Sequence, residues 1–162
     1  MLSRDAKQSE LTAVGNIRVA AYRADGFLSA DSEYEPRLRG LGNDGTGHVL
    51  VAADEDGGLL GTVMLQTWPY ASHVVTGPDR AEIRALAVLP EARGAGLGRA
   101  LLAAVTDRAV REGARELVLF TQTDMKTAHR LYESAGFVRL PERDWSPQPG
   151  VSLLAYRLVL KA

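Results

Sequence analysis

The chain has 162 residues, a net charge of −1 and 46% hydrophobic residues, which favours one domain of ordinary soluble composition. There is no basic excess to suggest a nucleic-acid partner, and no apolar run approaches the ~20 residues of a membrane span. The sequence contains no cysteine, which excludes disulfides, thiolate metal ligands and a cysteine nucleophile. Residues 1–5 are not followed by the apolar segment of a secretory signal, so the cytoplasm is the expected compartment.

Two amino-terminal segments are predicted to be helical. Residues 5–25 carry an imperfect apolar face at helical spacing, and Gly26 can end that helix. Residues 27–47 are polar, but Tyr34, Leu38 and Leu41 are spaced for a short second helix. Residues 1–4 are few and end in polar side chains, so we expect a first strand to be missing or rudimentary.

A hairpin of strands is predicted next. Residues 48–53 and 59–68 are apolar strand candidates, and the acidic, glycine-containing segment between them is typical of a tight turn. Gly61 indicates that a neighbouring element approaches the second strand closely. The following loop contains His73, for which a solvated position is favoured over a catalytic one.

The central feature of the sequence is a strand, a glycine-rich turn and a helix in immediate succession. Residues 83–89 form an apolar run that Pro90 ends, and apolar positions return at helical spacing from Leu97. The turn reads Arg93-Gly94-Ala95-Gly96-Leu97-Gly98, and Arg99 follows it. Backbone N–H groups and the positive end of a helix dipole would meet there, so a phosphate or pyrophosphate is the expected ligand. The three glycines would let the backbone approach it, and the two arginines would add charge.

This turn differs from two well-known phosphate-binding loops. The dinucleotide fingerprint requires a third glycine where Arg99 stands, and the Walker loop requires Gly-Lys-Ser/Thr, which the sequence lacks. A nucleotide or dinucleotide binder is therefore disfavoured. A packed connection without a ligand stays the alternative, because glycine-rich turns before helices are common.

The remaining elements are further strands and one more helix. The helix after the glycine turn is predicted to end near Glu112, followed by Gly113. A later helix is expected to begin after an N-cap at Thr123 or Asp124 and to end at Gly136. Strands are predicted over residues 117–120, 137–140 and 152–160, with a loop over residues 141–150. This order predicts a single mixed α/β domain over residues 1–162, in which helices flank a largely antiparallel sheet.

Two stretches resemble signatures of the GCN5-related N-acetyltransferase (GNAT) superfamily. The first is Arg-x-x-Gly-x-Gly at residues 93–98, which follows L-A-V-x-P and precedes R-A-L-L. The second is A-x-x-L-Y-E-x-x-G-F at residues 128–137. Because both motifs occur in the family's order with a strand between them, the chain is identified as a member, with a resemblance that runs from about residue 48 to residue 160.

In this family the glycine loop holds the pyrophosphate of coenzyme A, so the resemblance implies acetyl-CoA as co-substrate and no metal. It assigns to the cofactor the end of the central strand, the loop with the start of its helix, and two positions near the later motif: Leu86, Ala87, Val88, Arg93, Gly94, Ala95, Gly96, Leu97, Gly98, Arg99, Met125 and Ala128. Met125 departs from the pattern, because relatives often have asparagine there. A methionine can pack on the pantetheine arm but cannot make the amide contact.

The resemblance also implies an N-acetyltransferase in which an amine attacks the thioester directly. Backbone N–H groups around Ala87 and Val88 would polarise the thioester carbonyl, as is usual in relatives. Tyr132 is the candidate general acid, because a phenol of pKa ~10 stays protonated at neutral pH and can donate to a thiolate of pKa ~8.5. The alternative is a core tyrosine with a satisfied hydroxyl group.

Glu82, at the start of the central strand, occupies the position of the base in some family members. A carboxylate of pKa ~4.3 is a poor direct base for an ammonium, so it would need a pKa raised by burial or would act through water. The alternative is a glutamate that only attracts a cationic substrate.

A non-catalytic acyl-CoA-binding sensor or interaction module on the same fold is the alternative function, and Met125 is its only support. The expected partners are acetyl-CoA and an amine, without nucleic acid or membrane, and a homodimer is an analogy with the family. The acceptor would be set by residues 27–47, 68–79 and 141–150, whose sequence encodes no recognisable pocket.

Overall fold

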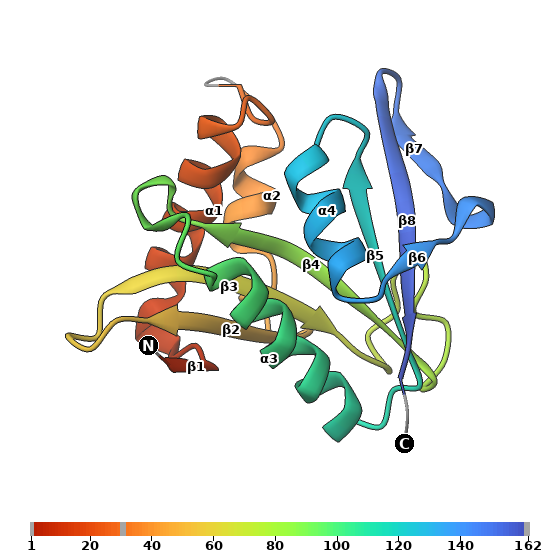
Figure 1. Ribbon diagram of the computed structural model, residues 1–162, viewed down its shortest axis with the longest axis horizontal. Helices are drawn as coiled ribbons and strands as arrows, with labels where there is room; N and C mark the ends of the chain where they lie inside the picture. Colours follow the sequence, from red (N-terminus) through yellow and green to blue (C-terminus); the bar gives the residue numbers. More distant parts are fainter. Residues whose placement is uncertain (1, 30–31, 161–162) are drawn as a thin grey trace. The chain divides into compact units, whose positions relative to one another are not determined.

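The computed structural model describes residues 2–29 and 32–160. Its helices are α1 (Leu11–Ala24), α2 (Glu35–Gly40), α3 (Leu97–Arg111) and α4 (Lys126–Ser134), as drawn in Figure 1. Its strands are β1 (Leu2–Asp5), β2 (His48–Ala53), β3 (Leu59–Gln66), β4 (Arg80–Val88), β5 (Glu116–Gln122), β6 (Val138–Arg139), β7 (Trp145–Gln148) and β8 (Val151–Val159).

The described strands form a mixed sheet of eight strands in the hydrogen-bonding order β1-β2-β3-β4-β5-β8-β6, with β7 also paired to β8. The β4–β5 pair is parallel. The β1–β2, β2–β3, β5–β8, β6–β8 and β7–β8 pairs are antiparallel. The predicted mixed, largely antiparallel α/β fold is therefore confirmed.

The chain divides into two compact units. The first contains Met1–Leu65 and Ala85–Asp107, and the second contains Gln66–Arg84 and Arg108–Ala162. Strand β4 and helix α3 each contribute residues to both units. The units are described separately below.

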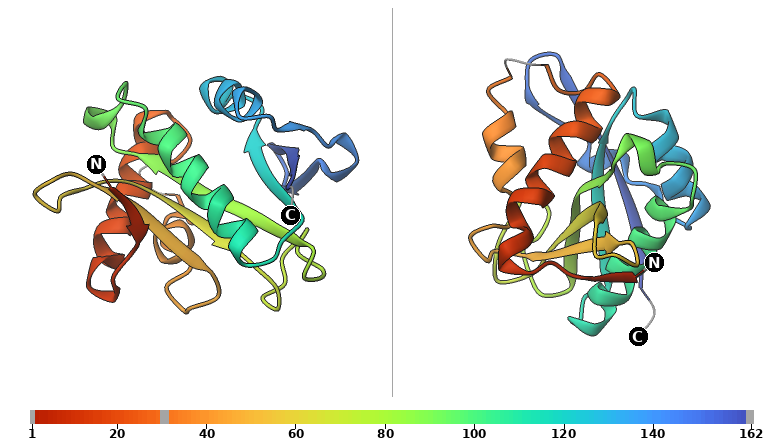
Figure 2. Two further views of the ribbon diagram at one scale, coloured as in Figure 1. Left: turned by 60° about the horizontal axis from the view of Figure 1, so that its bottom comes forward. Right: turned by 90° about the vertical axis from the view of Figure 1, so that its left-hand side faces the viewer.

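In the first unit, helices α1 and α3 cover opposite faces of the β2–β3 pair (Figure 2). Val14 of α1 packs with Val49, Val51 and Met64, whose side chains share one face. On the other face, a Cβ added to Gly61 would lie 2.9 Å from Leu101 Cδ1 of α3 and 3.0 Å from the Ala87 carbonyl oxygen of β4. The close approach predicted at Gly61 is confirmed, and it allows α3 to lie against the strands.

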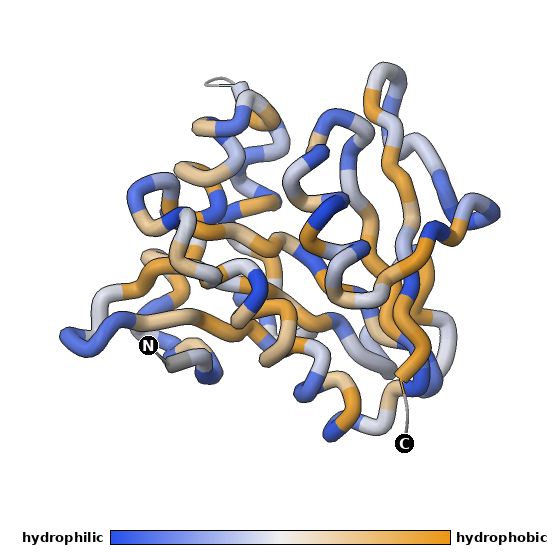
Figure 3. Tube along the Cα trace, viewed as in Figure 1, coloured by the Kyte–Doolittle hydropathy of each residue, from blue (hydrophilic) through white to orange (hydrophobic). Residues whose placement is uncertain are grey.

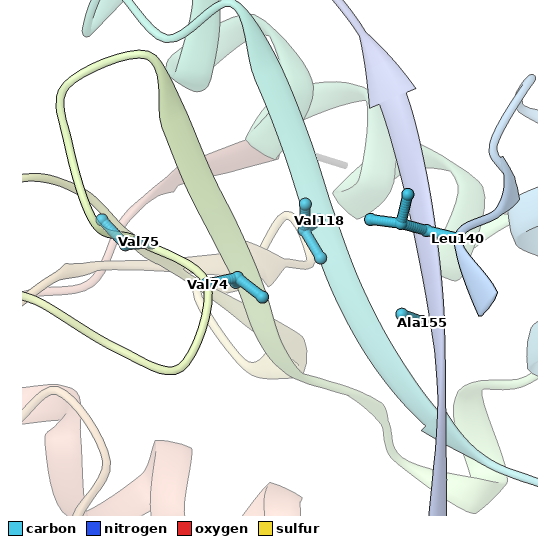
Figure 4. Packing of buried hydrophobic residues seen from close by; sticks show 5 residues of the cluster. All are labelled: Val74, Val75, Val118, Leu140 and Ala155. Atoms are coloured by element: carbon cyan, nitrogen blue, oxygen red, sulfur yellow. The ribbon is translucent and has the colours of Figure 1, made fainter. Parts of the chain in front are cut away.

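In the second unit, the two faces of the β4–β5–β8 sheet have different covers. Ile83, Leu119 and Tyr156 are register neighbours and share one face, on which Tyr132 of α4 lies with its ring centroid 6.2 Å from that of Tyr156. The opposite face carries Val118, which is fully buried under the loop between β3 and β4. Figure 4 shows the cluster there, made of Val74, Val75, Val118, Leu140 and Ala155.

Hydrophobic residues follow these strands along the trace. Figure 3 shows long hydrophobic stretches along β2, β3 and β8, whereas the turn between β2 and β3 is hydrophilic. That turn is closed by the Asp54 N–H, which donates to the Gly58 carbonyl oxygen at 2.9 Å, and Gly57 has a φ of 85°. The alternation of apolar strand and polar turn is what made the hairpin predictable.

Two predicted features are wrong, whereas the first strand, expected to be missing or rudimentary, is present as the four residues Leu2–Asp5, which pair antiparallel with β2. The segment predicted as a loop over residues 141–150 contains β7, which pairs with β8 across a register irregularity. The N-cap of α4 is Met125, without a side-chain cap hydrogen bond, rather than Thr123 or Asp124.

The other predicted elements are confirmed within a few residues at their ends. The first helix is shorter than predicted, because a 3₁₀ turn over Gln8–Glu10 precedes α1. Gly113 and Gly136 follow α3 and α4 with φ of 88° and 95°, as expected of residues after helix ends. Within residues 2–29 and 32–160, no helix is long and apolar enough to cross a bilayer.

Candidate active site

The glycine loop of the first unit lies at the start of helix α3. It follows a 3₁₀ turn over Pro90–Ala92 and leads into α3 at Leu97. Gly94 and Gly96 have φ of 90° and 79°, and a Cβ added to either would meet no atom within 4 Å. The loop is therefore open to an approaching ligand, and α3 begins directly after it, with its positive dipole end there.

Arg93, Gly98 and Arg99 of the loop differ in their contacts and in their exposure to solvent. The Arg93 guanidinium donates to both carboxylate oxygens of Asp25, from NH1 at 2.7 Å and from NH2 at 3.1 Å. NH2 also lies 3.4 Å from the Ala21 carbonyl oxygen. Arg93 thus ties the loop to the end of α1, while Arg99 is exposed and Gly98 is half-buried in the first turn of α3.

The end of β4 precedes this loop and carries an unusual residue. Ala85, within β4, has a φ of 52°, which is uncommon for a residue with a Cβ. Leu86 and Val88 are half-buried, and the Ala87 side chain is buried against Ile17 and Ala21 of α1. The side chain of Ala87 therefore packs in the core. Only the backbone of Ala87 would be left to contact a cofactor.

Glu82 belongs to the second unit, where it is 7% exposed. Its register partner is Val118, so its side chain lies on the face covered by the β3–β4 loop. Burial raises the pKa of the Glu82 carboxyl, and the charge of Arg84, a hydrogen bond from Ser72 and the charge of His73 oppose that rise. The direction of this shift is the one that a glutamate base would need.

The surroundings of Glu82 include His73, which the sequence analysis considered, and other residues that it did not single out. Arg84 Nε lies 3.9 Å from Glu82 Oε2, and Arg84 NH1 donates to Gln66 Oε1 at 3.1 Å. His73 is exposed, and its ring stacks on that of Trp145 with centroids 4.1 Å apart. Phe120 lies 6.1 Å from Trp145 between ring centroids. No local motif marks these residues, because five segments of the chain supply them, namely β3, the loop after it, β4, β5 and β7.

Tyr132 is 7% exposed on α4, with its ring 6.0 Å from that of Phe137 between centroids. One turn earlier on the helix, His129 is also buried, and its Nε2 lies 2.9 Å from the Gln122 carbonyl oxygen at the end of β5. Met125 at the N-cap is half-buried, with its sulfur 3.5 Å from Thr121 Oγ1. Ala128 is half-buried on the same helix.

The two catalytic candidates lie on opposite faces of the second unit's sheet. Tyr132 packs on the face of Leu119 and Tyr156, whereas Glu82 lies on the face of Val118. The structure therefore does not join them into a hydrogen-bonded pair. Among residues 2–29 and 32–160, no group of three or more His, Asp or Glu side chains is arranged to hold a metal ion.

The sequence model of the acetyltransferase (GNAT) family matches residues 12–137 of this chain. The chain belongs to that family. The match includes the glycine loop, Glu82, Tyr132 and the end of the second motif. Membership predicted from the two motifs is confirmed, and the chain is a member of a family of acetyl-CoA-dependent N-acetyltransferases.

Individual proteins with known sequences or structures are also similar to this chain. An uncharacterised N-acetyltransferase of Schizosaccharomyces pombe is 34% identical over 125 residues, which covers 77% of this chain and 72% of that protein. A mycothiol acetyltransferase of Kocuria rhizophila is 45% identical over 62 residues, and the match spans only 20% of its length. The solved structure of yncA from Salmonella typhimurium, assigned as an acetyltransferase and containing its cofactor acetyl-CoA, has a TM-score of 0.71 at 24% identity over 100% of this chain and 95% of its own.

Proposed function

We propose that this chain transfers the acetyl group of acetyl-CoA directly to an amine, with residues 1–162 acting as one acetyltransferase domain. The glycine loop from Arg93 to Gly98 would hold the pyrophosphate through backbone N–H groups at the start of α3. The open space around Gly94 and Gly96 fits such a ligand. Bound acetyl-CoA would supply an activated acyl group on a thiol that the protein itself, without cysteine, does not contain.

The observation that carries the proposal is the open glycine loop at the start of α3, in a chain that also holds a buried glutamate and a buried tyrosine at the positions of the family's base and acid. Direct transfer forms a C–N bond and breaks a C–S bond at one carbonyl carbon, so the amine that attacks loses a proton and the thiolate that leaves gains one. Glu82 would accept the amine proton, directly or through water, and Tyr132 would donate a proton to the thiolate. The two groups need not share a hydrogen bond, because one proton leaves the nitrogen and another reaches the sulfur.

The proposal is tested by mixing the protein with acetyl-CoA and a panel of small amines, amino acids and peptides, and by following free thiol. Tyr132→Phe should lower kcat by about 10²-fold, the lower range for one general acid. Tyr156→Phe is the matched control, because Tyr156 is a buried neighbour whose hydroxyl donates to Glu133 Oε2 at 2.9 Å. It should leave kcat within a few-fold of that of the unaltered chain.

Full activity in Tyr132→Phe would contradict the assigned mechanism. Coenzyme A binding without turnover on any amine would instead favour an acyl-CoA-binding module. The mycothiol acetyltransferases are much longer proteins than the segment matched here, so their names do not identify the acceptor of this chain. The acceptor has to be identified with the panel of amines. A homodimer and a cytoplasmic location stay predictions from the sequence.

A further inference from the structure

The loop between β3 and β4, residues 67–79, lies on the face of the sheet that carries Glu82. Its valines Val74 and Val75 are fully buried against Val118, the register neighbour of Glu82, as Figure 4 shows. This packing fixes the loop by apolar contacts. The polar groups of the same loop are thereby held next to the carboxylate.

Ser72 in this loop has a hydroxyl group whose oxygen already accepts two backbone hydrogen bonds. Its oxygen accepts hydrogen bonds from the N–H groups of Val74 and Val75, at 3.3 Å and 3.0 Å. A hydroxyl has two acceptor lone pairs and one proton, so the proton is left for another partner. That partner is the Glu82 carboxylate, with which the Ser72 side chain forms a hydrogen bond.

Gln66, at the end of β3, connects the loop to the other side of Glu82. Its Nε2 donates to the carbonyl oxygens of Tyr70 and Ala71, at 3.2 Å and 3.1 Å. Its Oε1 accepts from Arg84 NH1 at 3.1 Å, and Arg84 Nε lies 3.9 Å from Glu82 Oε2. Gln66 is 7% exposed, so these bonds replace those that water would otherwise make. The interactions form a closed ring through the loop backbone, Ser72, Glu82, Arg84 and Gln66.

We propose that Ser72, Arg84 and Gln66 are positioning residues, which hold the Glu82 carboxylate in one orientation and set the pH range in which it can accept the amine proton. The proposal rests on the role of Glu82 as base given above. The step that it serves moves one proton from the acceptor nitrogen to a Glu82 oxygen, directly or through water, and forms no bond to the positioning residues.

Charged groups also lie around Glu82 on the loop and on β4, β5 and β8, and Arg80, two residues earlier on β4, donates to Glu116 Oε1 at 2.6 Å. His73 is the titratable neighbour on the loop, and Arg84 is a second cation on β4. The register neighbour on β5 is the apolar Val118, and beyond it Arg157 of β8 donates to Glu116 Oε2 at 3.3 Å. Ser72 and Arg84 both lower the Glu82 pKa against the effect of burial. Removing the Ser72 hydroxyl or the Arg84 charge should therefore raise the Glu82 pKa further. Removing a contact that only supports the fold should leave the Glu82 pKa unchanged.

The first arm of the test measures proton binding by Glu82 without catalysis. The carboxyl carbons of glutamate are labelled with ¹³C, and the Glu82 signal, assigned by its loss in Glu82→Gln, is followed against pH. Ser72→Ala and Arg84→Gln should each raise the midpoint, and Ser72→Thr, which restores a hydroxyl, should return it. Ser146→Ala is the matched control, because the Ser146 hydroxyl donates only to backbone carbonyl oxygens in the described contacts. Unchanged midpoints in folded Ser72→Ala and Arg84→Gln would overturn the proposal.

The second arm measures kcat/KM against pH. A midpoint raised by one unit lowers kcat/KM about tenfold at acidic pH and leaves the plateau at higher pH unchanged. Gln66→Leu removes the hydrogen bonds that hold Arg84 and the loop. It should also move the acidic limb of the kcat/KM profile to higher pH. Equal losses at every pH, without a moved limb, would contradict the positioning role. The two proposals can also fail separately. If the ¹³C midpoints of Glu82 move in the variants, but the acidic limb of kcat/KM is unchanged in Glu82→Gln, then the positioning contacts are confirmed and the role of Glu82 as base is contradicted.

Discussion

At the scale of single residues, the buried Glu82 carboxylate shows how a feature proposed for catalysis opposes folding. Burial raises its pKa above the value of an unfolded chain, so the folded protein holds the carboxyl proton more tightly than the unfolded one. The linkage relation then requires stability to fall as pH rises from the ordinary value of a glutamate through the raised value. A burial retained at this cost in stability is typical of a functional site.

Glu82→Gln should therefore make the protein more stable at neutral pH while it removes activity. The amide keeps the volume and still accepts the proton of Ser72, but it carries no buried charge. The gain in melting temperature should be present at about pH 8 and vanish below about pH 4, where the carboxyl is protonated in both states. Melting curves of both proteins at the two pH values measure it. A loss of stability at pH 8 that disappears below pH 4 would show instead that the fold stabilises the charge itself.

At the scale of elements, the α1–α2 pair depends on a charge inside the first unit. Arg18 of α1 is 0% exposed, and its NH1 donates to the carbonyl oxygens of Leu38 at 3.1 Å and Leu41 at 2.8 Å. These carbonyls lie at the end of α2, a helix of 6 residues that is too short to be stable alone. Arg18 therefore fixes the end of α2 as a cap would.

Arg18→Met should lower the free energy of unfolding by about 2–4 kcal/mol, because two buried carbonyl groups lose a charged donor. Arg23→Met is the matched control on the same helix, since Arg23 also bonds to α2, through Glu35, but is exposed. Its cost should stay below about 1 kcal/mol. Urea unfolding of the two variants gives the comparison. Similar costs for both would mean that apolar packing, such as that of Val19 with Leu38, holds α2 without the arginine.

The elements also show what the sequence can and cannot predict. The glycine loop and Tyr132 are found from contiguous motifs, because strand, turn and helix signals there are local. The ring around Glu82 is not, because Gln66 and Arg84 lie 18 positions apart and meet only through tertiary structure. Strand β1 is predicted only as missing or rudimentary, because backbone pairing with β2 does not require apolar side chains. Strand β7 is missed because Pro147 suggests a loop, although a strand at a sheet edge tolerates it.

At the scale of the whole molecule, ligand binding and stability are linked. A ligand that binds only the folded protein adds RT ln(1 + [L]/Kd) to the free energy of unfolding, or about 2.7 kcal/mol at a concentration of 100 Kd. Coenzyme A, which lacks the reacting acetyl group, should therefore raise the melting temperature without turnover. This measurement reports on the pyrophosphate loop separately from Glu82 and Tyr132.

Two glycines of the first unit make the loop's role testable. Gly94 and Gly57 have φ of 90° and 85°, and a Cβ added to either would meet nothing within 4 Å. Gly94→Ala and Gly57→Ala should therefore each cost about 1–2 kcal/mol of stability through left-handed backbone strain alone. Only in Gly94→Ala would the added methyl group occupy space that the pyrophosphate needs, so only this variant should lose the shift caused by coenzyme A. If both variants gain equally from coenzyme A, the pyrophosphate lies elsewhere, and the family motif of this chain no longer holds its ligand.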